Sequence, residues 1–581
     1  MKILCSVCGL LLFISHALSQ ENPFIKLVNP TKIINKVSAS RQFLIGSTCK
    51  TCTLTVNGEN AKVYATGAFA YELNLTEGDT NFIMQATNAA GKKIVRNINF
   101  NYKKPDPPTP VTVPAIESIQ TFPAGNLVLA PGDKINFRVK ALPQSKLITY
   151  NNTVLYELPE SQTQGMPGIY QGTYTVKETD DFASLKFPVY LEAPHGEKVN
   201  KETQYSFSVM SPLSSDICFT KGRLAHLVYG LGQDRLGGAK MGYIDSLIPL
   251  KIIGKVGSDY KVQLAKTRVA YIPDDLVTLA PKGTLAQGSL TGSWQVYGDS
   301  LYDYVQVSLG ERLPYQAMQL INPSRVVVDI FGATGNTNWI KQLQTVKEIS
   351  NVDYEQITDD IFRVTIWLKH PQHWGHAVYY NGKSLVIKIK QQPPSLALKN
   401  MTIAVDAGHG GSNTGAGGPT GSSEKMIALS LSLKLQKALE KEGAKVIMTR
   451  TKEVFFDNKE RILFYRDSVP DLLLSIHLNS AADPIRAGGT STFYRYLGFR
   501  PLSVYIHNRM LELGLKDYGN IGSFNFMLNS PTEYPNALIE TLFISNPEEE
   551  MLILDEGFQQ KMADKIVAGV KDFLQHTARD K

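Results

Sequence analysis

Cysteine is scarce in this chain of 581 residues, which contains five, and only Cys49, Cys52 and Cys218 lie beyond its first stretch. Cys49 and Cys52 form a C-x-x-C in a strand-like region, and a small structural disulfide is the favoured interpretation for an exported chain. A redox site is less favoured, because no strand-helix-strand pattern surrounds the pair. A zinc site would need two more ligands, and none is nearby. Cys218 stands alone, as expected of a buried small residue.

Long apolar runs are also missing beyond the N-terminus. The first residues combine Lys2, a short apolar stretch and the small residues Ala17-Leu18-Ser19, which is the pattern of a secretory signal. A membrane anchor is the alternative, but a spanning helix needs ~20 apolar residues. We therefore expect residues 1–19 to be removed and no transmembrane segment to remain. Export to the periplasm is favoured, with release outside the cell as the alternative.

A strong excess of one charge is absent as well. The formal net charge is +7, and basic residues are scattered along the chain without forming a stripe. This argues against a nucleic-acid partner and fits an anionic cell-wall or lipid surface. With 43% hydrophobic and 19% charged residues, the composition is that of a globular protein. The length predicts several domains.

The first part of the chain has the alternating pattern of short strands separated by turns. Residues 24–103 resemble the immunoglobulin-like β modules of exported bacterial enzymes. Residues 104–114 are rich in proline and predict an extended linker. Residues 115–211 again show strand-turn-strand patterning and predict a second module resembling a β-sandwich.

Two further β regions follow. Residues 215–282 end in R-V-A-Y-I-P and resemble bacterial SH3-like modules, and residues 288–391 resemble the AMIN module of bacterial envelope amidases. The phrase H-P-Q-H-W-G-H places His370, His373 and His376 at three-residue steps, but its proline and glycine argue against a metal-binding helix. We interpret it as a polar turn between two strands, with its tryptophan as a partly buried anchor.

The pattern changes in residues 400–577, where strand and helix signals alternate. T-I-A-V-D, A-K-V-I-M-T and D-L-L-L-S-I predict buried strands, and helices are expected near 424–442, 458–468, 501–514 and from about 558. A further strand is expected at 537–541. The fold class is therefore multidomain: all-β modules are followed by an α/β domain with a mainly parallel sheet.

Four side chains that could bind a metal or transfer a proton lie at or just beyond the ends of these runs: His409, Glu424, His477 and Glu540. The carboxyl ends of parallel strands meet in one crevice, where ligand-binding groups cluster. Two imidazoles and one carboxylate are a known ligand set for catalytic zinc, with the fourth position left for water. A second carboxylate beside that water would act as general base. Taken together, the four residues predict a zinc hydrolase.

The same segment resembles the catalytic domain of zinc-dependent N-acetylmuramoyl-L-alanine amidases. The phrases that carry the resemblance are I-A-V-D-A-G-H-G-G-S-N-T-G, A-K-V-I-M-T-R-T, L-L-L-S-I-H-L-N-S and P-N-A-L-I-E-T-L-F-I-S-N-P-E-E-E. The resemblance implies that His409, Glu424 and His477 bind Zn²⁺ and that Glu540 is catalytic. It also implies peptidoglycan as substrate, cut between N-acetylmuramic acid and the L-alanine of the stem peptide.

Three further residues near the site have two interpretations each. Asp406 could orient the imidazole of His409 or simply be a carboxylate at a strand end. Arg450 could bind a substrate carboxylate, although a structural ion pair is favoured. Asn479 could position substrate or brace its loop.

Two other functions remain open at this stage: a zinc peptidase acting on stem-peptide bonds, and a non-catalytic scaffold that binds the cell wall. The β modules could also contact envelope or division proteins. Loss of one of the four site residues would favour the scaffold, and the sequence retains all four.

Overall fold

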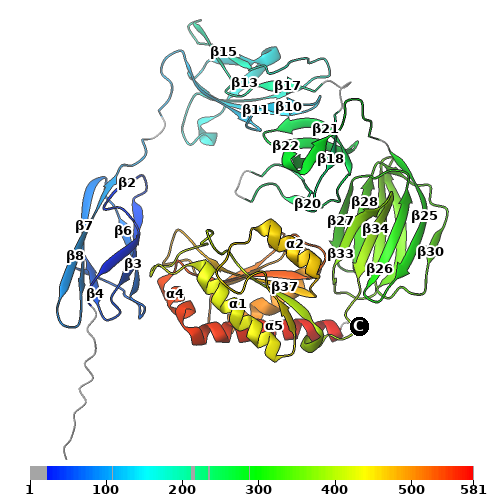
Figure 1. Ribbon diagram of the computed structural model, residues 1–581. Helices are drawn as coiled ribbons and strands as arrows, with labels where there is room; N and C mark the ends of the chain where they lie inside the picture. The colour runs from blue at the N-terminus through cyan, green and yellow to red at the C-terminus, as the bar shows by residue number, and fades with distance from the viewer. Residues whose placement is uncertain (1–21, 107–108, 211–215, 233–235, 287, 580–581) are drawn as a thin grey trace, which may run out of the picture.

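The computed structural model describes residues 22–106, 109–210, 216–232, 236–286 and 288–579. Modules of β-sheet occupy most of the chain, and a C-terminal domain with long helices lies between the first module and the later ones (Figure 1). The expected signal at 1–19 lies outside the described residues. Within the described residues, no helix has the length and apolar character needed to cross a membrane.

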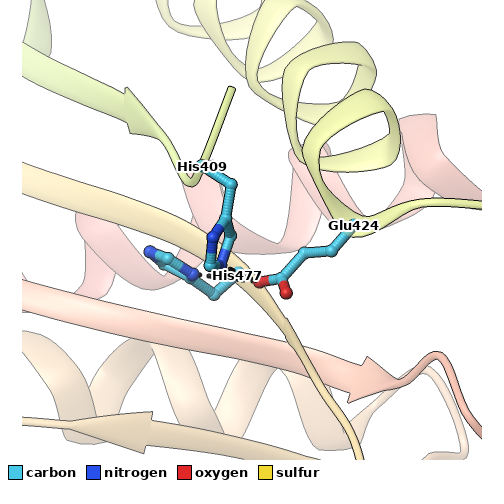
Figure 2. A group of neighbouring side chains, drawn as sticks. All are labelled: His409, Glu424 and His477. Carbon is cyan, nitrogen blue, oxygen red and sulfur yellow. Dashed lines mark hydrogen bonds and ion pairs between the residues drawn. The ribbon is translucent and has the colours of Figure 1, made fainter. Parts of the chain in front are cut away.

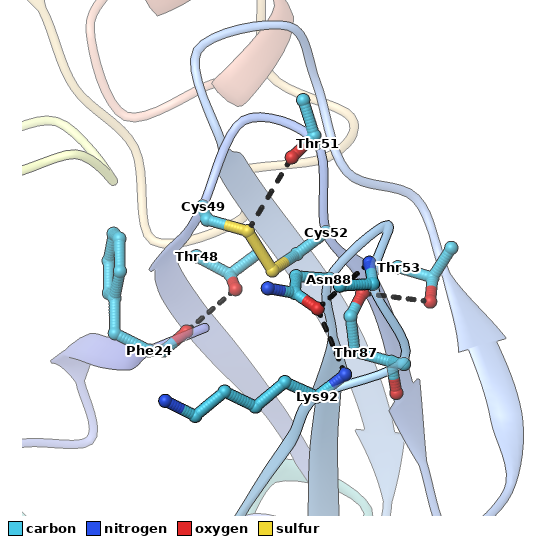
Figure 3. The surroundings of a disulfide bond; sticks show 10 residues. Phe24, Thr48, Cys49, Thr51, Cys52, Thr53, Thr87, Asn88 and Lys92 are labelled. Carbon is cyan, nitrogen blue, oxygen red and sulfur yellow. Dashed lines mark hydrogen bonds between the residues drawn. A yellow bond between two sulfur atoms is a disulfide. The ribbon is translucent and has the colours of Figure 1, made fainter. Parts of the chain in front are cut away.

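The N-terminal module consists of two sheets that enclose a core of alternating apolar side chains, including Leu44, Phe69 and Met84. Cys49 and Cys52 are bonded to each other in the turn between β3 and β4 (Figure 3). In sheet order, the strands are β1 (Ile25–Asn29), β3 (Arg41–Thr48) and β6 (Ala68–Asn74), and then β2 (Ile34–Val37), β8 (Lys93–Tyr102), β7 (Gly78–Thr87), β4 (Thr53–Val56) and β5 (Glu59–Ala61).

The second module is built on a seven-stranded antiparallel sheet. Its inner face carries an aromatic cluster in which Phe187 stacks on Tyr150 and meets Tyr174 and Phe207 edge-on. In sheet order, the strands are β16 (Lys198–Glu202), β15 (Pro188–Glu192), β12 (Lys146–Thr149), β13 (Thr153–Glu157), β14 (Ile169–Thr175), β11 (Lys134–Ala141) and β9 (Ile116–Phe122).

The next sheet joins this module to the SH3-like region. Strands β10 and β17 come from the second module in sequence, and β10 pairs with β21 of the following region. The buried Cys218 lies on β18 of the same sheet. Its path is β17 (Phe207–Val209), β10 (Leu127–Leu129), β21 (Pro249–Val256), β22 (Asp259–Ala265), β23 (Arg268–Pro273), β19 (His226–Val228) and β20 (Lys240–Tyr243), with β18 (Ile217–Thr220) beside β21 and β24 (Val277–Leu279) beside β18.

The AMIN-like region forms two further sheets. Its buried side chains belong to the same hydrophobic core as those of the SH3-like region, so these two regions pack as one unit although the sequence predicts separate modules. The strands are β29 (Ala333–Thr334), β25 (Ser289–Gly298), β26 (Tyr302–Leu309), β34 (Ser384–Lys390) and β33 (His376–Asn381) with β30 (Ile340–Gln342) beside β25, and then β27 (Tyr315–Leu320), β28 (Arg325–Phe331), β32 (Ile361–Leu368) and β31 (Ile349–Thr358).

The C-terminal domain contains the mainly parallel sheet that the sequence predicts. The first four strands run parallel, while β38 is antiparallel to β40. In order, they are β36 (Lys445–Ile447), β35 (Thr402–Ala407), β37 (Leu472–Asn479), β40 (Asn536–Phe543), β38 (Thr490–Phe493) and β39 (Asp517–Ile521). The strand expected at 537–541 is thus confirmed as β40.

Helices cover both faces of this sheet. Apolar residues of α1 (Glu424–Lys441), α3 (Arg500–Leu511) and α5 (Glu556–Arg579) share the larger core, whereas Tyr465 of α2 (Asn458–Ser468) packs on the opposite face. These four helices are the ones expected from the sequence. A fifth, α4 (Pro547–Leu554), was not expected; it is short and begins after Asn546, whose side chain caps it.

The histidine run at 370–376 is the expected turn between β32 and β33, but residues 372–376 of it are buried. His373 and His376 are almost fully buried, and so is Trp374, whose ring lies 6.0 Å from Phe573 of α5. The physical reason is that the run lies at the junction with the C-terminal domain. The backbone N–H of His376 donates to the carbonyl of Thr532 at 2.7 Å.

Candidate metal centre

His409 lies two residues beyond β35, in a turn that reverses the chain sharply. Its φ of 59° is left-handed, and the glycines that follow, Gly410 and Gly411, also have positive φ. The preceding Gly408 is required for space, because a side-chain carbon there would lie 2.5 Å from Cε1 of His477. The glycines therefore allow two imidazoles from different strands to approach each other.

Glu424 is the first residue of α1 and is almost fully buried. One carboxylate oxygen, Oε1, lies 3.0 Å from Nε2 of His409 and 3.0 Å from Nδ1 of His477. The backbone N–H of Leu478 donates to that oxygen, and the N–H of Ala416 donates to the other. The carboxylate is thus fixed by backbone groups, with one oxygen shared between two imidazoles.

These three residues bring two nitrogens and one oxygen together (Figure 2). Their ligand atoms all lie within 4.8 Å of one another, and the two rings meet edge to face with centroids 4.9 Å apart. On the far side of His409, Nδ1 lies 2.9 Å from Oδ1 of Asn413. A hydrogen bond from Nδ1 to that amide leaves Nε2 as the free lone pair facing the centre.

Electrostatics at the centre match this arrangement. Burial alone would raise the pKa of Glu424, but the hydrogen bonds from His409 and His477 outweigh it and hold that pKa well below its usual range. Burial would lower the pKa of His477, but Glu424 and, more weakly, Glu540 and Asp406 raise it. The carboxylate is therefore ionised, and the two imidazoles beside it, when neutral, offer the lone pairs that a metal cation needs.

Glu540 lies on β40, directly beside His477 on β37, because the two residues are partners in the parallel register. Side chains of partnered residues point to the same face of a sheet, and neighbouring strands are ~4.8 Å apart. Glu540 is partly exposed, in contrast to its apolar neighbours on the strand. The structure thus places the fourth predicted residue beside the three that converge.

Asp406 does not orient the imidazole of His409. It is completely buried and accepts hydrogen bonds from Arg461 at 2.8 Å, Thr449 at 3.0 Å and Tyr465 at 3.1 Å. The physical reason is its place inside β35, where its carboxylate meets Arg461 and Tyr465 of α2. It holds α2 to the sheet.

Arg461 is the residue that sequence reasoning missed here. Besides Asp406, it donates to the carbonyls of Ala407 and His409, so it fixes the backbone that carries the imidazole. A buried arginine on the apolar side of an amphipathic helix would have been the signal. Asn413 was missed in the same way, although it follows His409 by four residues in the same glycine-rich turn.

Arg450 and Asn479 brace the loops. Arg450 is buried and donates to the carbonyls of Ala407, Gly408 and Lys425, with Glu453 at 3.6 Å. Asn479 accepts from the backbone N–H of Ser480, and its own carbonyl accepts from Ile544. These contacts support the structural interpretation of both residues over substrate binding.

Glu550 on α4 supports the loop before α1. It is fully buried, and it accepts hydrogen bonds from the backbone N–H and hydroxyl of Thr420 and from the hydroxyl of Ser422. Ser423 occupies the N-cap position of α1, without a capping hydrogen bond from its side chain. The turn that presents Glu424 is therefore held by α4, the helix that follows β40.

Two imidazoles that follow adjacent parallel strands and a carboxylate at the start of α1 form a group that could hold a metal ion, with the ligand types found in hydrolases. Comparison with known proteins shows which families this part of the chain resembles. Residues 403–572 match the family model described as N-acetylmuramoyl-L-alanine amidase, and residues 295–399 match that of the AMIN domain. The C-terminal domain is therefore similar to this amidase family, and the region before it is similar to the AMIN domain.

Individual relatives and solved structures each cover 30% of the chain. The "Probable cell wall amidase LytH" of Staphylococcus aureus is 35% identical over 179 residues, which are 30% of this chain and 60% of the relative. Among solved structures, an N-acetylmuramoyl-L-alanine amidase from Clostridium difficile 630 is 30% identical, with 30% of this chain and 97% of that chain covered and a TM-score of 0.29. The catalytic domain of CwlV from Bacillus (Paenibacillus) polymyxa var. colistinus is 29% identical, with 30% and 98% covered and a TM-score of 0.29.

Proposed function

We propose that this protein is a zinc-dependent N-acetylmuramoyl-L-alanine amidase that cleaves peptidoglycan between N-acetylmuramic acid and the L-alanine of the stem peptide. The observation that carries the proposal is the convergence of His409, Glu424 and His477 within 4.8 Å, with Glu540 as the register partner of His477. The family match over residues 403–572 supports the choice of bond and substrate.

In this proposal, His409, Glu424 and His477 hold the metal. The donor set fits zinc: two neutral imidazoles and one carboxylate, with the carboxylate fixed by two backbone N–H groups. When bound, zinc would lower the pKa of a coordinated water to about 7 and polarise the scissile carbonyl. Asn413 and Arg461 keep the His409 turn in place.

Glu540 acts as the general base. It takes a proton from the attacking water, whose oxygen forms the new bond to the lactyl carbonyl carbon. As the carbon–nitrogen bond breaks, Glu540 returns the proton to the departing amine of L-alanine. The products are a glycan with a free lactyl carboxylate and a peptide with a free amino terminus. A positioned base of this kind contributes ~10²–10⁴ in rate.

The decisive experiment compares the wild type with Glu540→Ala on purified sacculi, with products identified by mass spectrometry and zinc content measured in both proteins. We expect Glu540→Ala to lower turnover by ~10²–10⁴ and to retain the metal. Glu440→Ala removes an exposed carboxylate of α1 and is the matched control, with unchanged turnover.

The products decide among the alternatives. Glycan freed of whole stem peptides is the result expected of the amidase. Shortened peptides still attached to glycan would show a zinc peptidase, and binding without products would show a scaffold. If Glu540→Ala keeps most of its activity, the role of Glu540 is wrong.

The family match and the AMIN domain agree with a protein that acts outside the cytoplasm. We propose export through the N-terminal signal, with the periplasm as the favoured destination and release from the cell as the alternative. Fractionation of cells that produce the full chain, followed by detection in the periplasm and in the medium, tests this.

A further inference from the structure

The N-terminal module contacts the C-terminal domain at the loops that follow the three strands of the metal centre. After β35, a side-chain carbon built at Gly421 would lie 3.0 Å from Nζ of Lys26. After β37, Asp483 lies 2.5 Å from Arg41 of the module. After β40, Glu548 on α4 lies 3.8 Å from Lys62. Because the carboxyl ends of parallel strands form the mouth of such a site, the module stands at that mouth.

The module borders the metal centre without sealing it. With the module in place, the side chains of His409 and His477 remain 22% and 17% exposed. A covering domain would have removed this exposure. The position is therefore that of a wall beside the site, which leaves the metal-facing atoms open to solvent and to substrate.

Exposed charges make the contact. Arg41 and Arg486 both pair with Glu72 and Asp483, so two residues of the module and two of the loop after β37 form one ionic cluster. Arg486 is 62% exposed. Single exposed pairs contribute little, but a network of four fixes a relative orientation. The loop on the other side is held by Glu550, which binds Thr420 and Ser422.

Lys26 is the cation of this wall that lies beside the loop leading to Glu424. It is exposed, and among the described residues its ammonium has no hydrogen-bond or ion-pair partner, in contrast to Arg41 and Lys62. Gly421 precedes Glu424 by three residues, so their Cα atoms are at most ~11 Å apart. A stem peptide of three or four residues spans a comparable length.

We propose that the N-terminal module forms one wall of the substrate cleft and that Lys26 binds the terminal carboxylate of the stem peptide. This rests on the proposed amidase activity. A peptide joined to the glycan through its amino end has a carboxylate at its other end. An ammonium positioned beside the cleft would pair with that carboxylate while the amide lies at the metal centre. Lys26 is thus a specificity-determining residue contributed by another module.

The test uses two muropeptides that differ only at the end of the stem peptide, one with a free carboxylate and one with a carboxamide. We expect the wild-type chain to have a KM about fivefold lower for the carboxylate, with equal kcat. Lys26→Ala should abolish this preference, whereas Lys93→Ala, which removes an exposed lysine of the same module, should preserve it. A preference that survives in Lys26→Ala overturns the proposal.

Binding separates this inference from the proposed function. Calorimetry with Glu540→Ala measures affinity for the same two ligands without turnover. Preferential binding of the carboxylate that depends on Lys26 supports the wall even if the wild type releases no peptide. Equal affinity for both ligands overturns the proposed role of Lys26 even if the wild type is an active amidase.

A cross-link distinguishes a wall from a lid. In the Lys62→Cys/Glu548→Cys chain, a short bismaleimide would fix the module to α4. The native thiols of the described chain are shielded, since Cys49 and Cys52 are bonded and Cys218 is buried. We expect the cross-linked protein to keep the kcat and the carboxylate preference of the uncross-linked one. Loss of turnover on cross-linking would show that the module must move during the reaction, as a lid does, and would overturn the proposal that it is a fixed wall.

Discussion

Two groups of histidines in this chain lie in different environments. His409 lies in the turn after β35 and His477 on β37; they share one oxygen of Glu424 and remain partly exposed. His373 and His376 lie three residues apart at the AMIN junction and are buried, and their neighbours are backbone carbonyls, Ser324 and an amide.

The difference lies in the charge beside the rings. A shared carboxylate raises the pKa of His477 despite burial, and so favours a site where positive charge collects. Without a carboxylate, burial lowers the pKa of His373 to about 4 and that of His376 to about 3. In the part of this chain that the structure describes, only the pair that has a carboxylate between its rings and access to solvent forms a candidate metal site.

The largest effect is expected from removing that shared charge. Glu424→Gln preserves the shape of the side chain but replaces one proposed metal ligand with a neutral amide. Because even indirect partners of a metal ligand contribute 10–100-fold in affinity, we expect loss of a direct ligand to lower zinc affinity by more than ~100-fold. Zinc content after dialysis and peptide release from sacculi measure the effect.

His373→Gln is the matched substitution in the other group. Its amide can still donate to the carbonyl of Leu320, which Nε2 of His373 contacts at 3.0 Å. We expect zinc content and kcat to equal those of the wild type. Zinc loss in His373→Gln, or full zinc content in Glu424→Gln, would contradict the distinction between the two groups.

The second-largest effect concerns the junction itself. Trp374 lies between the two buried histidines and packs against the core of the C-terminal domain. Truncation of a buried tryptophan costs ~3–5 kcal/mol, so we expect Trp374→Ala to lower the free energy of unfolding by about that amount. Denaturation followed by circular dichroism measures it. An unchanged midpoint would show that the junction does not stabilise the domain.

Local sequence patterns predict the C-terminal domain well. The strand carrying T-I-A-V-D and the helices that begin at Glu424 and Asn458 follow from the spacing of apolar residues, which depends only on near neighbours in the chain. The shared sheet of β10, β17 and β21 was not predictable in this way. It pairs Leu127 with both Phe207 and Val256, far along the chain, and no local pattern encodes which distant strands become neighbours.

The contrast between local patterns and long-range pairings also applies to the candidate site. His409, His477 and Glu540 could be placed together because parallel strands present their carboxyl ends at one edge. The partner of Asp406 could not be predicted, since Arg461 lies 55 residues away on a helix and reaches it across the sheet. The position of the N-terminal module at the mouth of the site could not be predicted either, because Arg41 and Asp483 are 442 residues apart.

The third effect is a pH dependence of stability from the junction. His373 and His376 have folded-state pKa values of about 4 and about 3, below the ordinary value of 6.5. Below pH 6.5 the unfolded chain therefore binds protons that the folded chain does not, so stability is full above pH 6.5 and is lost as the pH falls toward 4. Each histidine should remove about 2 kcal/mol between pH 7.5 and pH 5.

Denaturant titrations at several pH values measure this slope. His373→Gln should flatten it by the share of one histidine, since glutamine does not titrate. The exposed His195 lies in another module, and His195→Gln is the control that should leave the slope unchanged. An equal slope in His373→Gln and the wild type would mean that His373 is protonated in the folded state.

The smallest effect is expected at His370, the remaining histidine of the run. It is the one whose imidazole contacts a carboxylate. Its Nδ1 lies 2.7 Å from the buried Glu348, whose pKa burial raises and His370 lowers. Glu348 also accepts from the backbone N–H groups of His370 and Gln392, so it keeps partners when the imidazole is lost. We expect His370→Gln to cost no more than about 1 kcal/mol in unfolding free energy, because glutamine can replace one donor at a partly exposed position. Zinc content should not change, since Glu348 meets one imidazole where Glu424 meets two. A loss of zinc in His370→Gln would place a second metal site at the junction and remove the distinction between the groups.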